Sequence, residues 1–185
     1  YAFAKLNIDW YIDVIITNHM TFELIPEDGV GGRTYWSDLI TLCIDEKKMS
    51  KSKLTEVLVH ELCHAARWGK NDEWMNSLFD GIINEGIATY FEAEFAKTHT
   101  EKQFFIETIL AREDEINEKI LEKLRDQLNL EKYDYETIFF NGSENLPRWS
   151  GYSLGYYLVK KYLKKTKKEI EDVFFDKYAD FRIVL

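Results

Sequence analysis

Three ionisable residues interrupt a stretch of the chain that is otherwise apolar. His60, Glu61 and His64 stand within residues 57–66, where every other residue is valine, leucine, cysteine or alanine. A helix places residues four apart on one face, so both imidazoles can reach a single point. Neutral imidazole nitrogen binds zinc at about 2.0–2.1 Å. The pair therefore predicts a zinc site carried by one turn of a helix.

Glu61 has a different place on the same helix. It follows His60 directly and lies about 100° further round the helix axis, beside the metal rather than on it. A general base stands in that position when it takes a proton from a water activated by the metal. The spacing is the H-E-x-x-H pattern of zinc metalloproteases. Each of the three polar groups in this apolar helix needs a partner, and one metal ion would provide a partner for all three.

A third ligand is required, because catalytic zinc takes three protein ligands and keeps one position open. The form of the pattern with a third histidine needs it six residues after His64, and this chain has lysine there. Glu85 lies in a second apolar helical stretch, with 20 residues between it and His64, enough for a turn and a returning helix. Glu92 and Glu94 are competing candidates. Glu92 lies about two turns from Glu85 on the same face, and one helix presents one level to the metal, which favours Glu85.

The elements that must position these residues change in kind at about residue 49. Before it, runs of β-branched and aromatic residues predict strands at 11–17, 20–25 and 39–44. Turn residues separate them, above all at 26–32. After it, a helix is expected over 52–68, capped by Ser50 or Ser52 and stopped at Gly69.

Helix formers dominate the remainder of the chain. Further helices are predicted at about 72–97, with an interruption near Gly81, and at 101–128, 133–140, 149–164 and 169–178. The expected fold is therefore α+β, with a small and mostly antiparallel N-terminal sheet over the active-site helix. We predict one domain over residues 1–185, made of a β-rich lobe at about 1–49, that helix, and a helical lobe at 72–185.

Composition excludes several classes of protein. The 185 residues are 45 % hydrophobic and 15 % aromatic, enough for a sizeable core and unlike a disordered chain. The net charge of −9 lacks the basic footprint of a nucleic-acid binder. No apolar run reaches the roughly 18–20 residues of a membrane span. Two cysteines make no disulfide framework. We expect a cytoplasmic protein, and a signal or anchor preceding Tyr1 stays open.

The motifs together resemble the gluzincin metallopeptidases. The H-E-x-x-H segment is followed by Asn-Glu-Gly-x-Ala around Glu85, close to the form in zinc aminopeptidases. Tyr152 and Gly155 match a Tyr-x-x-Gly that those enzymes carry in a later helix, where the tyrosine hydroxyl faces the metal. Over about residues 30–180 the chain most resembles a small bacterial family of predicted zinc-dependent proteases, which also has a Gly-Arg-Thr-like segment, here residues 32–34. The Gly-x-Met-Glu-Asn segment that holds a substrate amine in aminopeptidases is absent.

This resemblance implies a zincin-like fold and a peptidase acting on peptide or protein substrates. One Zn²⁺ per chain would be held by His60, His64 and Glu85, with Glu61 as general base. Tyr152 would donate a hydrogen bond to the oxyanion.

The sequence also predicts features that support the site. Asn84 and Thr89 are the nearest polar residues that could orient the histidines. A substrate is expected to bind extended along a sheet edge formed by residues 39–44. Two other functions stay open: a zinc-binding regulatory domain without catalysis, and a peptide-binding module with structural zinc. Glu61 argues against the first, because coordination alone does not need it. Cys63 argues against the second, because it does not share the face of the two histidines.

Overall fold

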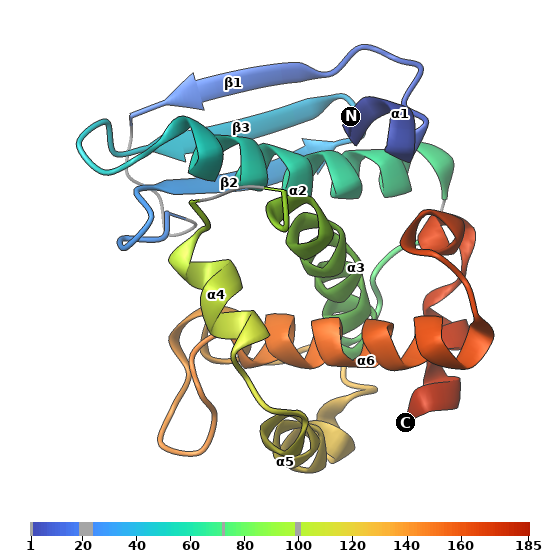
Figure 1. Cartoon of the computed structure of the whole chain (residues 1–185). Helices are drawn as coiled ribbons and strands as arrows, with labels where there is room; N and C mark the ends of the chain where they lie inside the picture. The colour runs from blue at the N-terminus through green and yellow to red at the C-terminus, as the bar shows by residue number, and fades with distance from the viewer. Residues whose placement is uncertain (1, 19–23, 72, 99–100) are drawn as a thin grey trace. The chain divides into compact units, whose positions relative to one another are not determined.

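In the described residues, the sheet is followed by helices and no further strand (Figure 1). The computed structural model describes residues 2–18, 24–71, 73–98 and 101–185. The strands are β1 (Asp13–Thr17), β2 (Val30–Trp36) and β3 (Leu39–Ile44). The α-helices are α1 (Ala2–Leu6), α2 (Lys51–Lys70), α3 (Leu78–Ala96), α4 (Phe104–Leu110), α5 (Asp114–Leu124) and α6 (Ser150–Thr166). The 3-10 helices are η1 (Arg125–Gln127), η3 (Ile170–Phe175) and η4 (Tyr178–Val184), and η2 (Thr137–Asn141) is a π-helical turn. The predicted α+β class is confirmed.

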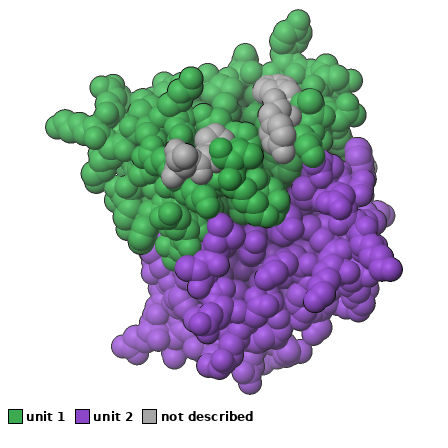
Figure 2. Space-filling model, in the orientation of Figure 1, with its two compact units in different colours: residues 1–72, 91–108 green, residues 73–90, 109–185 purple. Residues whose placement is uncertain are grey.

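The chain forms two compact units, coloured separately in Figure 2. The first contains residues 1–72 and 91–108, and the second contains residues 73–90 and 109–185. Helix α3 is continuous from Leu78 to Ala96. Its residues up to 90 belong to the second unit, and its residues from 91 belong to the first. The single domain over residues 1–185 stays a prediction.

The sheet of the first unit has the order β1-β3-β2. β3 pairs antiparallel with β2 and parallel with β1, so the sheet is mixed rather than mostly antiparallel. β2 and β3 form an antiparallel hairpin. β1 pairs with the other side of β3, and the long connection between them lets the two strands run parallel. The strand predicted at 39–44 is confirmed as β3, but it is central and paired on both sides. Its predicted role as a substrate-binding edge is therefore wrong, because the described sheet has its edges at β1 and β2.

The first three residues of β2, 30–32, lie in the segment that the sequence predicts as a turn, because two of them are glycine. Gly29, with a φ of +68°, closes the turn, and the strand begins at the next residue. A Cβ on Gly32 would lie 2.6 Å from the Glu61 Cγ, so α2 approaches this strand too closely for a side chain. A strand is also predicted at 20–25, and its residues 20–23 lie outside the described residues.

Helix α2 begins as the sequence predicts, with the Ser50 side chain accepting from the Lys53 N–H. It does not stop at Gly69, which lies inside the helix. The Trp10 indole packs on this glycine, 2.4 Å from where a Cβ would stand. Gly69 is therefore a site of close packing rather than a C-terminal cap.

Two other helix predictions need correction. α3 begins at Leu78 rather than at residue 72 and continues without interruption through Gly81. The helix predicted at 101–128 is divided into α4 and α5. The start at Phe104 is set from outside the helix, because the Asp28 carboxylate accepts from the N–H groups of Phe104 and Phe105.

The second unit is organised around α6, which packs against α5, η2 and η4. Predicted helices at 149–164 and 169–178 correspond to α6 and to the 3-10 helix η3. Within the described ranges, no helix combines the length and apolar character needed to cross a membrane.

Candidate metal centre

The two histidines of α2 point their Nε2 atoms at one another. His60 and His64 are 8 % and 7 % exposed, and their Nε2 atoms are 3.1 Å apart. Two nitrogen ligands at about 2.0–2.1 Å from a tetrahedral zinc ion lie about 3.3 Å from each other. The pair therefore fits the spacing that zinc requires.

The Glu92 carboxylate contacts Nδ1 of His60, the ring nitrogen that does not face His64. His60 Nδ1 lies 2.8 Å from Glu92 Oε2. An ionised carboxylate only accepts, so Nδ1 carries the proton and Nε2 presents its lone pair. Burial raises the pKa of Glu92 to about 7, although the hydrogen bond with His60 lowers it. A carboxylate on the outer nitrogen of a ligating histidine is a common feature of zinc sites.

Glu61 is held by the neighbouring strand β2. The Thr34 hydroxyl lies 2.7 Å from Glu61 Oε2 and 2.9 Å from the Glu61 backbone oxygen. Thr34 and Gly32 are two residues apart and face α2 together, so the glycine makes room for the carboxylate that the threonine binds. The segment at residues 32–34 thus supports the proposed general base.

Glu85 completes a group of residues that could hold a metal ion. One ligand atom from each of His60, His64 and Glu85 lies within 4.8 Å of the others. These are the three ligands predicted from the sequence. The competing candidates have other partners, because Glu92 contacts His60 and Glu94 pairs with Lys97 on the surface.

Two motif glycines meet where α3 and α6 cross in the second unit. A Cβ on Gly86 would lie 2.4 Å from the Gly155 carbonyl carbon, and one on Gly155 would lie 2.2 Å from the Ile82 oxygen. Gly86 follows Glu85 and Gly155 lies one helical turn after Tyr152. The crossing therefore fixes the helix segments that carry Glu85 and Tyr152.

We expect Gly155→Ala to destabilise the protein, because the three atoms nearest to the new methyl group are all backbone atoms. Overpacking of this kind costs about 3 kcal/mol, which lowers the Tm by about 6–12 °C. Thermal unfolding measures the effect, with Lys164→Ala at an exposed position of α6 as the control. An unchanged Tm for Gly155→Ala would contradict this tight crossing.

Aromatic rings surround Tyr152 in the second unit. Its ring is edge-on to Phe139 and to Phe140, at centroid distances of 5.5 and 6.1 Å. Tyr133 also lies beside Phe139, and its hydroxyl would be 2.9 Å from a Cβ on Gly81. Burial raises the pKa of Tyr133, and the charges of Glu85 and Asp80 raise it further. A side chain at position 81 would therefore clash with the Tyr133 hydroxyl, although the helix is continuous there.

Asn84 and Thr89 are the two residues predicted to orient the histidines. The Thr89 hydroxyl oxygen is buried and has no hydrogen-bond partner among the described residues, and its role in orienting the histidines stays a prediction. Asn84 accepts from the Tyr178 hydroxyl at 3.1 Å, and its effect on the histidines stays a prediction. The sequence alone predicts Glu92 as a rival ligand and does not indicate its contact with His60. Its spacing of seven residues from Glu85 was the available signal for a residue on the same face.

The chain matches a known protein family. Residues 2–182 match the model of a family described as predicted Zn-dependent protease (DUF2268). The chain belongs to this family. Membership confirms the resemblance to a family of predicted zinc-dependent proteases, and the family description supports zinc dependence and protease activity in general. No curated protein and no solved structure matches the chain.

Proposed function

We propose that this chain is a peptidase that holds one Zn²⁺ on His60, His64 and Glu85. Glu61 serves as general base and Tyr152 as oxyanion donor. The observation that carries the proposal is the 3.1 Å approach of the two histidine Nε2 atoms, with His60 Nδ1 bound to Glu92. This arrangement leaves lone pairs converging on one point, as metal ligands require.

Zinc supplies Lewis acidity when bound, lowering the pKa of a water and polarising the scissile carbonyl. Glu61 accepts a proton from the attacking water and delivers it to the leaving amine. Thr34 binds Glu61 Oε2, so Oε1 is the oxygen that we assign to the proton transfer. Fixing one oxygen keeps the other in a constant direction during turnover.

The substrate is proposed to be an extended polypeptide that pairs with β2. This strand is an edge of the described sheet, and its Thr34 contacts the general base. Main-chain pairing with an edge strand would hold a peptide without selecting its sequence, leaving selection to the side-chain subsites. β2 thereby replaces the strand at 39–44 in the proposed binding mode.

The purified protein should contain about one zinc per chain and cleave an unfolded protein. Removal of zinc with a chelator should abolish cleavage, and added Zn²⁺ should restore it, because the ligands alone supply no Lewis acid. Elemental analysis and gel electrophoresis measure the two properties. Cleavage that persists in the metal-depleted protein would overturn the proposal, whereas zinc binding without cleavage of any polypeptide would favour the non-catalytic alternative.

Tyr152→Phe should lower kcat by about 10²–10³, the usual cost of losing an oxyanion donor. The phenylalanine ring keeps the edge contacts with Phe139 and Phe140, so the fold and the zinc content should not change. Tyr156→Phe, one turn further along α6, is the matched control and should retain kcat. Full kcat in Tyr152→Phe would remove this tyrosine from the mechanism.

A further inference from the structure

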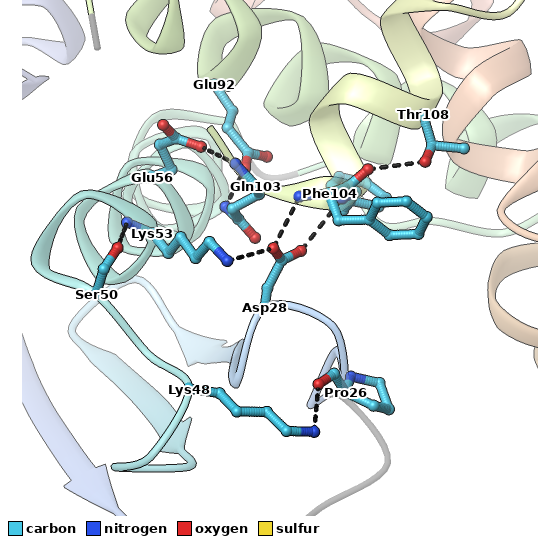
Figure 3. Close-up of polar contacts among 11 residues, drawn as sticks. Pro26, Asp28, Lys48, Ser50, Lys53, Glu56, Glu92, Gln103, Phe104 and Thr108 are labelled. Atoms are coloured by element: carbon cyan, nitrogen blue, oxygen red, sulfur yellow. Dashed lines mark hydrogen bonds and ion pairs between the residues drawn. The ribbon is translucent and has the colours of Figure 1, made fainter. Parts of the chain in front are cut away.

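Gln103, which precedes α4, contacts the buried carboxylates of Glu56 and Glu92 (Figure 3). Its side-chain Nε2 donates to Glu92 Oε1 at 2.7 Å, and Glu92 Oε2 lies 2.8 Å from His60 Nδ1. Its backbone N–H donates to Glu56 Oε2 at 3.0 Å. Glu56 and His60 are four residues apart on α2, so the contacts leave this helix and return to it one turn away.

These groups are removed from water almost completely. Glu56 and Gln103 are 0 % exposed, and Glu92 is 1 % exposed. A buried carboxylate oxygen without a donor is costly, because no water replaces the missing hydrogen bond. Gln103 supplies the donor for one oxygen of Glu92, which leaves the other oxygen directed at His60. Rotation of the Glu92 carboxylate would break both contacts together.

The start of α4 does not depend on this amide. The Asp28 carboxylate accepts from the N–H groups of Phe104 and Phe105, at 2.7 and 3.2 Å, and pairs with Lys53 at 3.3 Å. Asp28 therefore caps the helix, whereas the Gln103 side chain reaches Glu92. The oxygen of the Gln103 amide has no hydrogen-bond partner among the described residues, so the bond to Glu92 is the one that this amide makes there.

We propose that Gln103 is a positioning residue of the metal centre. By fixing the carboxylate of Glu92 it holds the His60 imidazole in the tautomer and direction that bind the metal. The inference rests on the proposed zinc site and adds a residue that no motif in the sequence indicates. Loss of an outer partner of this kind weakens metal binding or activity by about 10- to 100-fold.

Gln103→Met tests the inference, because methionine has a similar length, lacks the donor and leaves the backbone N–H to Glu56 intact. Zinc affinity is measured by competition with a chromophoric chelator, and the absorption spectrum of Co²⁺ bound to the full chain reports the ligand geometry. We expect a 10- to 100-fold weaker affinity for zinc and an altered cobalt spectrum. Asp28→Asn is the matched control. It weakens the cap of α4, so it should lower the Tm while the affinity and the spectrum stay as in the wild type.

A second variant keeps the test decisive if the methionine protein does not fold. Gln103→Asn retains an amide but shortens its reach, so it should also weaken zinc binding. Wild-type affinity and spectrum in a folded Gln103 variant would overturn the inference. So would an equal loss of affinity in Asp28→Asn, because the effect would then follow the stability of α4. Absence of zinc binding in the wild type would instead overturn the proposed function, and the wild-type titration alone shows it.

Discussion

Glu61→Gln is expected to bind zinc as the parent does and to lose hydrolysis by about 10²–10⁴-fold. Glutamine retains an oxygen to accept from the Thr34 hydroxyl, so the contact between α2 and β2 should survive. It does not take up a proton from water, which is the step assigned to the carboxylate. Zinc content, Tm and kcat on one unfolded substrate measure the three consequences.

Glu94→Gln is the matched control for this substitution. Glu94 is a surface residue of α3 that pairs with Lys97, so the variant should retain both zinc and hydrolysis. Loss of zinc in Glu61→Gln would make Glu61 a ligand. Wild-type hydrolysis in the same variant would show that the proton passes through another group.

His64→Ala is expected to abolish zinc binding. Two remaining protein ligands do not make a stable zinc site, and alanine is favourable in the middle of α2. Zinc should raise the Tm of the wild type through preferential binding to the folded state, and it should leave the Tm of the variant unchanged. Equilibrium dialysis and thermal unfolding with and without zinc measure the two effects.

Cys63→Ala is the control for His64→Ala. Cys63 is adjacent in the sequence and buried, but it lies on another face of the helix. This variant should keep its zinc. Retention of zinc at wild-type affinity by His64→Ala, or its loss in Cys63→Ala, would require a different set of ligands.

The fold class and the principal site residues could be predicted because they depend on local patterns. The spacing of His60 and His64 places both on one helix face, and helical periodicity alone establishes that. Glu85 stands out because a carboxylate within an apolar stretch needs a partner. These inferences required no knowledge of where α2 and α3 lie in space.

The failures come from contacts between segments distant in sequence. Gly69 has the composition of a helix stop, but Trp10 uses it as a packing surface. Helix α4 starts at Phe104 because Asp28, far earlier in the chain, supplies its cap. Gln103 gives no sign of contacting Glu92, since an isolated glutamine before a helix is ordinary. Only the tertiary structure brings such pairs together.

The placement of Glu85 and Glu92 on one helix also constrains how the chain can change in length. The two carboxylates are seven positions apart on α3, which is almost two turns and a rise of about 10.5 Å. One residue inserted or deleted between them would turn one carboxylate by about 100° relative to the other and shift it by about 1.5 Å. We therefore expect insertions to be tolerated in exposed loop residues such as 143–145, whereas the stretch from 85 to 92 should admit no change in residue count.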